Sequence, residues 1–171
     1  MELNRREILQ AVALAAFTRL QLPAATQGSP LFFNADQFAT LDLLTDLIIP
    51  TDSHSPGAHE AGVAVFIDKS VAEAFAAEDK ESWTKGIAAI DTLARSQHDA
   101  PFKALKHEQQ TALLSALAAK QEDPKSPAEK FFGQLKETTA FVYYSSSIGI
   151  HQDIEYKGNV LLDQFVGYDA T

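Results

Sequence analysis

The chain has 171 residues, a formal net charge of −9 and a hydrophobic content of 46%, a balance typical of one folded domain. The acidic excess argues against nucleic acid and anionic membrane surfaces as partners, because both attract clustered lysine and arginine. The absence of cysteine excludes disulfides, thiolate metal sites, cysteine-attached haem and a cysteine nucleophile. The sequence also lacks the glycine spacings of dinucleotide and P-loop sites and the G-x-S-x-G and H-E-x-x-H motifs, so it carries none of these catalytic signatures.

The first thirty residues carry two adjacent arginines, Arg5 and Arg6, before a short apolar run over 11–17. This order resembles a twin-arginine export signal, and we expect residues 1–30 to be an export leader. The alternative is an amphipathic N-terminal helix with two solvated arginines. The apolar run is far shorter than the ~20 residues that span a bilayer, and no other stretch is longer, so the sequence predicts no membrane span.

Residues 31–171 are predicted to form a single all-α domain, a bundle of about five helices followed by a long irregular C-terminal arm. The first helix follows a capping box at 34–37 and ends before Pro50. A loop over 51–57 leads to a second helix that begins near His59. The apolar side chains predicted to form the buried stripe of this second helix are Val63, Phe66, Ile67, Val71 and Phe75.

Three further helices complete the predicted bundle. The third ends before Pro101, and the fourth covers about 106–120. The fifth begins with a capping box at 126–129 that has Pro127 at the first helical position, and it continues to Tyr143 and Tyr144. The apolar residues expected to face the core from these three helices are Trp83, Ile87, Ile90, Ala94, Leu113, Leu114, Leu117, Phe131, Phe132, Leu135 and Val142.

After Ser145 the helical periodicity ends, although the sequence stays apolar. So many apolar side chains without a period cannot all turn toward one local core, and left in water they would form a large exposed patch. We therefore expect residues 145–171 to form an extended arm that packs partly on the helices and partly on another protein. Its predicted anchors are Tyr143, Tyr144, Tyr156, Phe165 and Tyr168.

Four residues with oxygen or imidazole ligands, Asp52, His54, His59 and Asp68, are close in sequence. If three or four of them converged, the chain would be a small metal-binding protein. Their spacing does not impose convergence, and a polar loop followed by acids at a helix start explains the same residues. No catalytic, cofactor-binding or metal-binding residue is therefore assigned to the chain.

Three patterns resemble the small subunit of gluconate 2-dehydrogenase, a family known as subunit 3. The first, similar to the family's IIP-x-D … PGA-x-EAGV-x-x-FID, reads Ile48-Ile49-Pro50-x-Asp52, then Pro56-Gly57-Ala58-x-Glu60-Ala61-Gly62-Val63 and Phe66-Ile67-Asp68. The second, similar to G-Y-Y-T-S, is Tyr143-Tyr144-Ser145-Ser146, with Val142 in place of the glycine. The third, similar to E-x-G-Y-x-G-N but one residue shorter, is Glu155-Tyr156-Lys157-Gly158-Asn159.

The resemblance implies a non-catalytic subunit of an oxidoreductase complex. Members of the family accompany a large flavoprotein of the glucose–methanol–choline class, which carries FAD and oxidises a sugar, sugar acid or polyol. A c-type cytochrome subunit often takes the electrons. The small subunit carries the export signal, which implies a periplasmic protein that would be peripheral to the inner membrane through its complex.

The partner interface is expected on the arm and on the loop over 50–61, where Pro50, Asp52 and Pro56 are candidate contacts. A free-standing helical binding module is the alternative function. FAD, and any haem, would lie in partner subunits.

Overall fold

The computed structural model describes residues 29–156 and 158, and within them all regular structure is helical. The elements are α2 (Ala35–Ile48), α3 (Val63–Glu73), α4 (Ala77–His98), the short 3-10 helix η1 (Phe102–Ala104), α5 (His107–Ala118), α6 (Pro127–Ser145) and the π-helix η2 (Gly149–Asp153). The prediction of an all-α fold with five main helices is thus confirmed. Residues 1–28 of the predicted leader lie outside the described residues, and so do residues 157 and 159–171 of the predicted arm.

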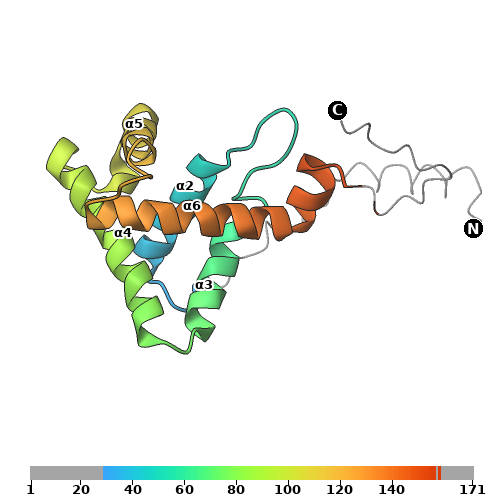
Figure 1. The fold of residues 1–171 in the computed structure, drawn as a ribbon, viewed down its shortest axis with the longest axis horizontal. Helices are drawn as coiled ribbons and strands as arrows, with labels where there is room; N and C mark the ends of the chain where they lie inside the picture. Colours follow the sequence, from blue (N-terminus) through green and yellow to red (C-terminus); the bar gives the residue numbers. More distant parts are fainter. Residues whose placement is uncertain (1–28, 157, 159–171) are drawn as a thin grey trace, which may run out of the picture.

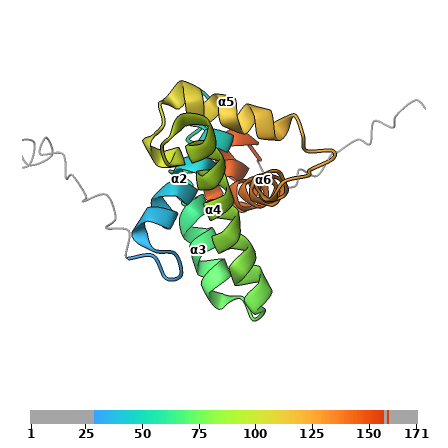
Figure 2. The same cartoon turned by 90° about the vertical axis from the view of Figure 1, so that its left-hand side faces the viewer.

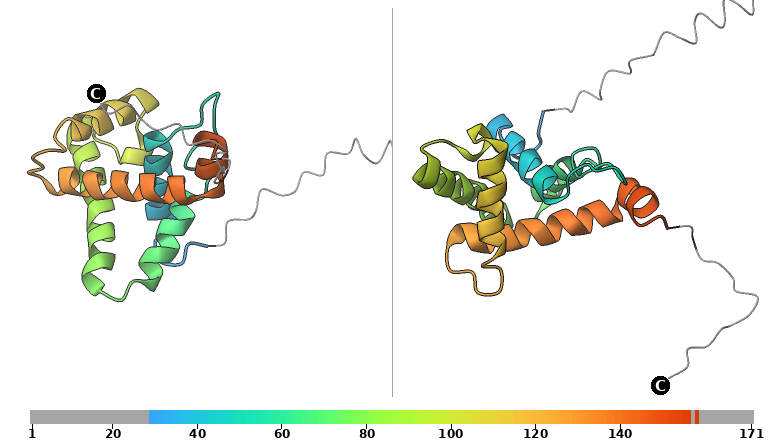
Figure 3. Two further views of the ribbon diagram at one scale, coloured as in Figure 1. Left: turned by 45° about the vertical axis from the view of Figure 1, so that its right-hand side comes forward. Right: turned by 90° about the horizontal axis from the view of Figure 1, so that it is seen from above.

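Helix α6 organises the bundle. It crosses the body in Figure 1 and lies along its lower edge in the right panel of Figure 3, and it contacts each of the other four described α-helices. Seen nearly along the axis of α6, the other helices lie above it, to its left and below it (Figure 2). Its buried side chains, including Phe131, Leu135 and Tyr143, form the centre of the core. The ring of Phe131 packs edge-on against Trp83 of α4, with ring centroids 5.5 Å apart.

Two helix starts follow directly from their capping residues. The side chain of Asn34 accepts a hydrogen bond from Gln37 N at 2.8 Å, and the Gln37 side chain accepts one in return from Asn34 N. At α6, Ser126 and Glu129 form the same reciprocal pair. These bonds satisfy backbone N–H groups that have no partner inside the helix, so both predicted capping boxes are confirmed.

Helix α3 differs from the prediction at its start and along its apolar stripe. It begins at Val63, after Gly62 has taken a left-handed conformation with φ of 70°, which interrupts the helical path that the sequence predicted from His59. Val63, Ile67 and Val71 are buried, as expected. Phe66 is 54% exposed and Phe75 is fully exposed, so their assignment to the buried stripe was wrong.

The carboxylate of Asp68 anchors the start of the described chain. It is 3% exposed and accepts hydrogen bonds from the backbone N–H groups of Leu31, Phe32 and Phe33, at 2.6, 3.1 and 2.9 Å. Three donors on one carboxylate compensate for burying its charge. This contact fixes the segment that leads into α2 against α3.

None of the described helices combines the length and apolarity needed to cross a bilayer.

Candidate functional site

The loop between α2 and α3 is closed on itself by short-range hydrogen bonds. Ala58 N donates to Ile49 O at 2.8 Å across the neck of the loop. Inside it, one oxygen of Asp52 accepts from His54 N and Ser55 N, at 2.7 and 2.9 Å. These bonds lower the pKa of Asp52. The loop is therefore a defined turn in which Asp52 has a structural role.

Gly57 occupies a position in this loop where no side chain fits. A Cβ atom there would lie 2.5 Å from Thr51 N and 2.7 Å from Ile49 O, and backbone atoms cannot yield to it as a flexible side chain would. Gly57 N donates to the hydroxyl of Thr51, which in turn donates to Glu60 at 2.9 Å. The Pro-Gly-Ala part of the sequence signature thus encodes a tight backbone approach.

Tyr143, near the end of α6, holds this loop from 87 residues away. Its ring is fully buried, and its hydroxyl donates to Pro56 O at 2.7 Å and lies 3.0 Å from the hydroxyl of Ser55. The Ser55 hydroxyl is also 3.3 Å from a carboxylate oxygen of Asp153 in η2, and His54 Nε2 is 3.0 Å from Asp153 O. We call this set of five residues the clasp.

The clasp joins two of the patterns that the sequence singled out, the Pro-Gly-Ala loop and the Tyr-Tyr pair. Because a carbonyl oxygen only accepts, His54 Nε2 must carry a hydrogen. The bond to Asp153 O, helped by the nearby charges of Glu155 and Asp153, raises the pKa of His54. The polar groups of the clasp bind one another or backbone atoms. The clasp therefore holds the loop between α2 and α3 against the end of α6 and against η2.

The four candidate metal ligands are distributed among separate interactions. Asp52 caps the loop turn, and His54 binds Asp153 O. His59 Nδ1 pairs with Asp42 at 2.8 Å, and this partner raises the pKa of His59. The carboxylate of Asp68 is engaged by three backbone N–H groups. Nowhere in residues 29–156 or at 158 do three or more His, Asp or Glu side chains gather in a way that suits a metal ion.

The predicted interface residues divide between core and surface. Tyr143 is buried within this chain, so its ring anchors the helices and offers no surface to a partner. Tyr144 and Tyr156 are 45% and 51% exposed, and partial burial beside Asp153 raises the pKa of Tyr144. Pro50 and Asp52 are exposed and Pro56 is half-buried. Phe165 and Tyr168 lie outside the described residues.

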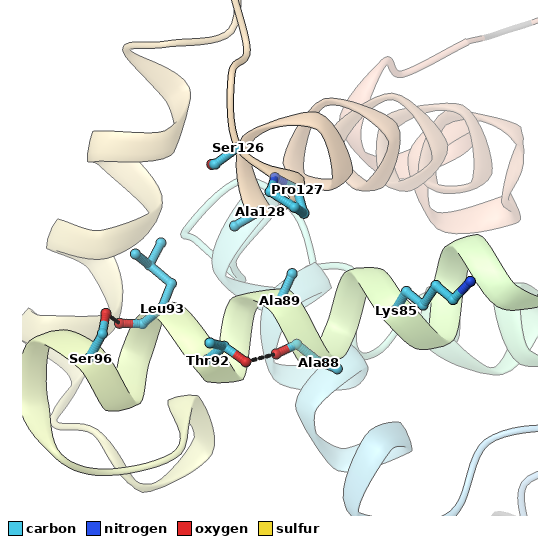
Figure 4. Close-up of a pocket in the computed structure, with 9 residues that line it drawn as sticks. All are labelled: Lys85, Ala88, Ala89, Thr92, Leu93, Ser96, Ser126, Pro127 and Ala128. Atoms are coloured by element: carbon cyan, nitrogen blue, oxygen red, sulfur yellow. Dashed lines mark hydrogen bonds between the residues drawn. The ribbon is translucent and has the colours of Figure 1, made fainter.

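A cavity of about 520 Å³ lies between the second half of α4 and the start of α6 (Figure 4). Its walls consist largely of small side chains. The hydroxyls of Thr92 and Ser96 already donate to carbonyls of their own helix, at 2.8 and 2.7 Å, and Lys85 pairs with Glu81. The cavity thus offers few polar groups with which to orient a small ligand.

Sequence reasoning missed the structural roles of Asp68 and of the Tyr143 hydroxyl, and it also missed η2. Asp68 directly follows Ile67, which belongs to the predicted buried stripe. An acidic residue beside such a stripe is the one sequence signal that could have indicated a buried, hydrogen-bonded carboxylate. The contact between Tyr143 and Pro56 had no signal in the spacing, because it joins residues far apart in the chain. The same reasoning left Phe141 unremarked, and this residue is 70% exposed.

No curated protein and no solved structure matches the chain. Among protein families, the one described as gluconate 2-dehydrogenase subunit 3 matches residues 35–160. This range covers the five α-helices of the described residues, the loop and the clasp, and it includes the three patterns whose resemblance to the family was noted in the sequence. The chain therefore belongs to the gluconate 2-dehydrogenase subunit 3 family.

Proposed function

We propose that this chain is the non-catalytic small subunit of a periplasmic, FAD-dependent dehydrogenase complex that oxidises the CH–OH group of a sugar, sugar acid or polyol. The family match over residues 35–160 carries the proposal. The partner would be a large flavoprotein of the glucose–methanol–choline class, with a c-type cytochrome as a further subunit in some complexes. In this proposal FAD and the catalytic residues belong to the partner.

The role of the small subunit in this proposal is to fold with the flavoprotein, stabilise it and take it through the twin-arginine route. A flavoprotein acquires FAD in the cytoplasm and must therefore be folded before it crosses the membrane. One export signal serves two chains if they bind tightly beforehand, and tight binding needs a large, partly apolar interface. The arginine pair at Arg5 and Arg6 would supply the signal.

The clasp supports this proposal because it fixes the surface on which the predicted interface lies. His54 and Ser55 tie the exposed loop containing Pro50 and Asp52 to η2. A surface that is already ordered loses less conformational entropy when it binds. We propose that Tyr144, Tyr156 and this loop contact the flavoprotein.

The test is co-expression of the flavoprotein with this chain in three forms: wild type, a variant with Arg5→Lys and Arg6→Lys, and a control with Arg19→Lys. We expect FAD-loaded, active enzyme in the periplasm with the wild type and the control. With the double variant, the complex should form but stay in the cytoplasm. Unchanged flavin content, activity and export of the flavoprotein when this chain is omitted would refute the proposal, and would favour a free-standing binding module.

A further inference from the structure

We propose that the flavoprotein subunit also docks on a second surface, the α3 face, formed by Leu31, Val65, Phe66 and Phe141. This inference rests on the proposed function and adds to it the location of an apolar contact that the sequence did not indicate. The four side chains are 70%, 45%, 54% and 70% exposed. An exposed cluster of large apolar groups is a common mark of a protein–protein contact.

The α3 face is continuous because two cavities share Phe66. One cavity, of about 610 Å³, is bordered by Leu31, Phe38, Val65 and Phe66. The other, of about 240 Å³, is bordered by Phe66 and Phe141. An apolar surface with two adjoining hollows therefore runs from the segment before α2, across α3, to the last third of α6. Projecting side chains of a partner would fill these hollows.

Charged groups are scarce on the α3 face, although charged residues make up 22% of the chain. Among the residues that border the two cavities, the charged ones are Asp68 and Lys69. The Asp68 carboxylate is buried and holds three backbone N–H groups. Lys69 lies 4.0 Å from Glu73 of its own helix. Few charges and several aromatic rings are typical of the centre of a protein interface.

The charges of the chain also distinguish between candidate partners for the α3 face. A second copy of this chain would bring together two bodies that each carry a net charge of −9, and their repulsion opposes association. The chain's own segment 1–28 contains Arg5, Arg6 and Arg19, whereas the cavities offer these arginines no exposed carboxylate. A folded partner with a neutral, apolar surface has neither disadvantage, and in the proposed complex that partner is the flavoprotein subunit.

The size of the surface also fits a folded subunit. With roughly half of each large side chain exposed, the four residues offer on the order of 300–400 Å². That area is close to half of the ~800 Å² that each partner buries in a stable complex. Phe141 and Tyr144 are one turn apart on α6 and hence neighbours, so the α3 face adjoins the predicted contact at Tyr144. Together they form one extended interface.

The test compares the variants Phe66→Lys, Phe66→Ser and Phe141→Lys with a matched control, Phe75→Lys, in the complete complex. Phe75 is fully exposed and lies just beyond α3, and it borders neither of the two cavities. Each full-length variant is co-expressed with the flavoprotein, and the dissociation constant is measured by dilution of the purified, FAD-loaded complex. We expect a ten- to hundredfold loss for Phe66→Lys and Phe141→Lys, a smaller loss for Phe66→Ser, and wild-type affinity for the control. Because the replaced rings are exposed, urea unfolding should be nearly unchanged.

The outcomes separate this inference from the proposed function. If the wild-type chain does not bind the flavoprotein, the proposed function fails and the inference with it. If the wild type binds and the Phe66 and Phe141 variants bind equally well, the inference alone is wrong. It is also wrong if these substitutions convert a dimer of the isolated chain into a monomer. Increased binding of a hydrophobic dye after deletion of residues 1–28, reversed by Phe66→Lys, would identify that segment as the occupant and likewise overturn it.

Discussion

Replacing Tyr143 with phenylalanine removes a single oxygen from the clasp and leaves the buried ring in place. The hydroxyl donates to Pro56 O at 2.7 Å, and both the ring and Ser55 are buried. A neutral hydrogen bond contributes about 0.5–1.5 kcal/mol, and an acceptor left without a donor adds to the loss when it is shielded from water. Ser55 keeps its contact with Asp153. We therefore expect Tyr143→Phe to lower the free energy of unfolding by about 1–2 kcal/mol.

The assay is urea unfolding of the full-length chain, followed by circular dichroism. The matched control is Tyr144→Phe, the same chemical change one residue further on, at a ring that is 45% exposed. A surface change of this kind should alter stability by no more than about 0.5 kcal/mol. In thermal unfolding the Tyr143 variant should melt roughly 5 °C below the wild type. Equal stability of the two variants would refute the view that the Tyr143 hydroxyl holds the loop.

Four further substitutions probe other parts of the structure. Asp68→Asn leaves a neutral amide facing three backbone donors and should destabilise by about 2–4 kcal/mol in urea; a loss below 0.5 kcal/mol would contradict the anchoring role. Gly57→Ala should destabilise by more than about 1 kcal/mol, because the added Cβ would meet backbone atoms. Gly133→Ala has open space at its Cβ and should stabilise α6 by about 0.5–1 kcal/mol. If Gly57→Ala proved the more stable of the two variants, the backbone clash at Gly57 would be excluded. Hydrogen bonds from Ser126 N, Lys120 and Lys125 N lower the pKa of Glu129 to about 2, so its stabilising effect is full above pH ~4.5 and is lost as the pH falls toward 2. The stability difference between wild type and Glu129→Gln should therefore shrink between pH 6 and pH 3, and a constant difference would refute the lowered pKa.

The helices were predictable where local chemistry decides them. Asn34 and Ser126 begin α2 and α6 through hydrogen bonds to residues three positions on, and such bonds can be read from sequence alone. The stripes through Ile87 in α4 and Leu135 in α6 are buried as their spacing predicted. Local pattern and tertiary packing agree in these helices, and the predictions were therefore correct.

The errors arose where tertiary contacts determine the outcome. Phe66 is strongly apolar, but Ile67 and Val71 of the same helix face the core. This orientation of α3 leaves the Phe66 ring exposed. Periodicity alone assigned it to the buried face, because a stripe can be widened on either side. The helical turn at Gly149–Asp153 was predicted to be irregular. It packs on the end of α6, and no local signal distinguished it from a loop.

The candidate site could be predicted only in part, because it too depends on a contact between residues far apart in the chain. The Pro-Gly-Ala loop and the Tyr-Tyr pair were recognised as patterns, but nothing in the sequence indicated that Tyr143 would reach Pro56. The roles assigned to Tyr144, Tyr156, Pro50 and Asp52 stay predictions, since they concern a partner that the chain does not contain.

The bond between Tyr143 and Pro56 also has a consequence for the order of events during synthesis. The two residues are 87 positions apart, and a ribosome adding about 5–20 residues per second needs roughly 4–17 s to cover that distance. Single helices form in about a microsecond or less, so α2 and α3 can form long before α6 exists. During those seconds the loop lacks the hydrogen bond from Tyr143. The apolar sides of α2 and α3 are exposed, so they can aggregate or bind a chaperone. Synthesis of α6, rather than helix formation, therefore sets the earliest time at which the loop between α2 and α3 can be held in its final position.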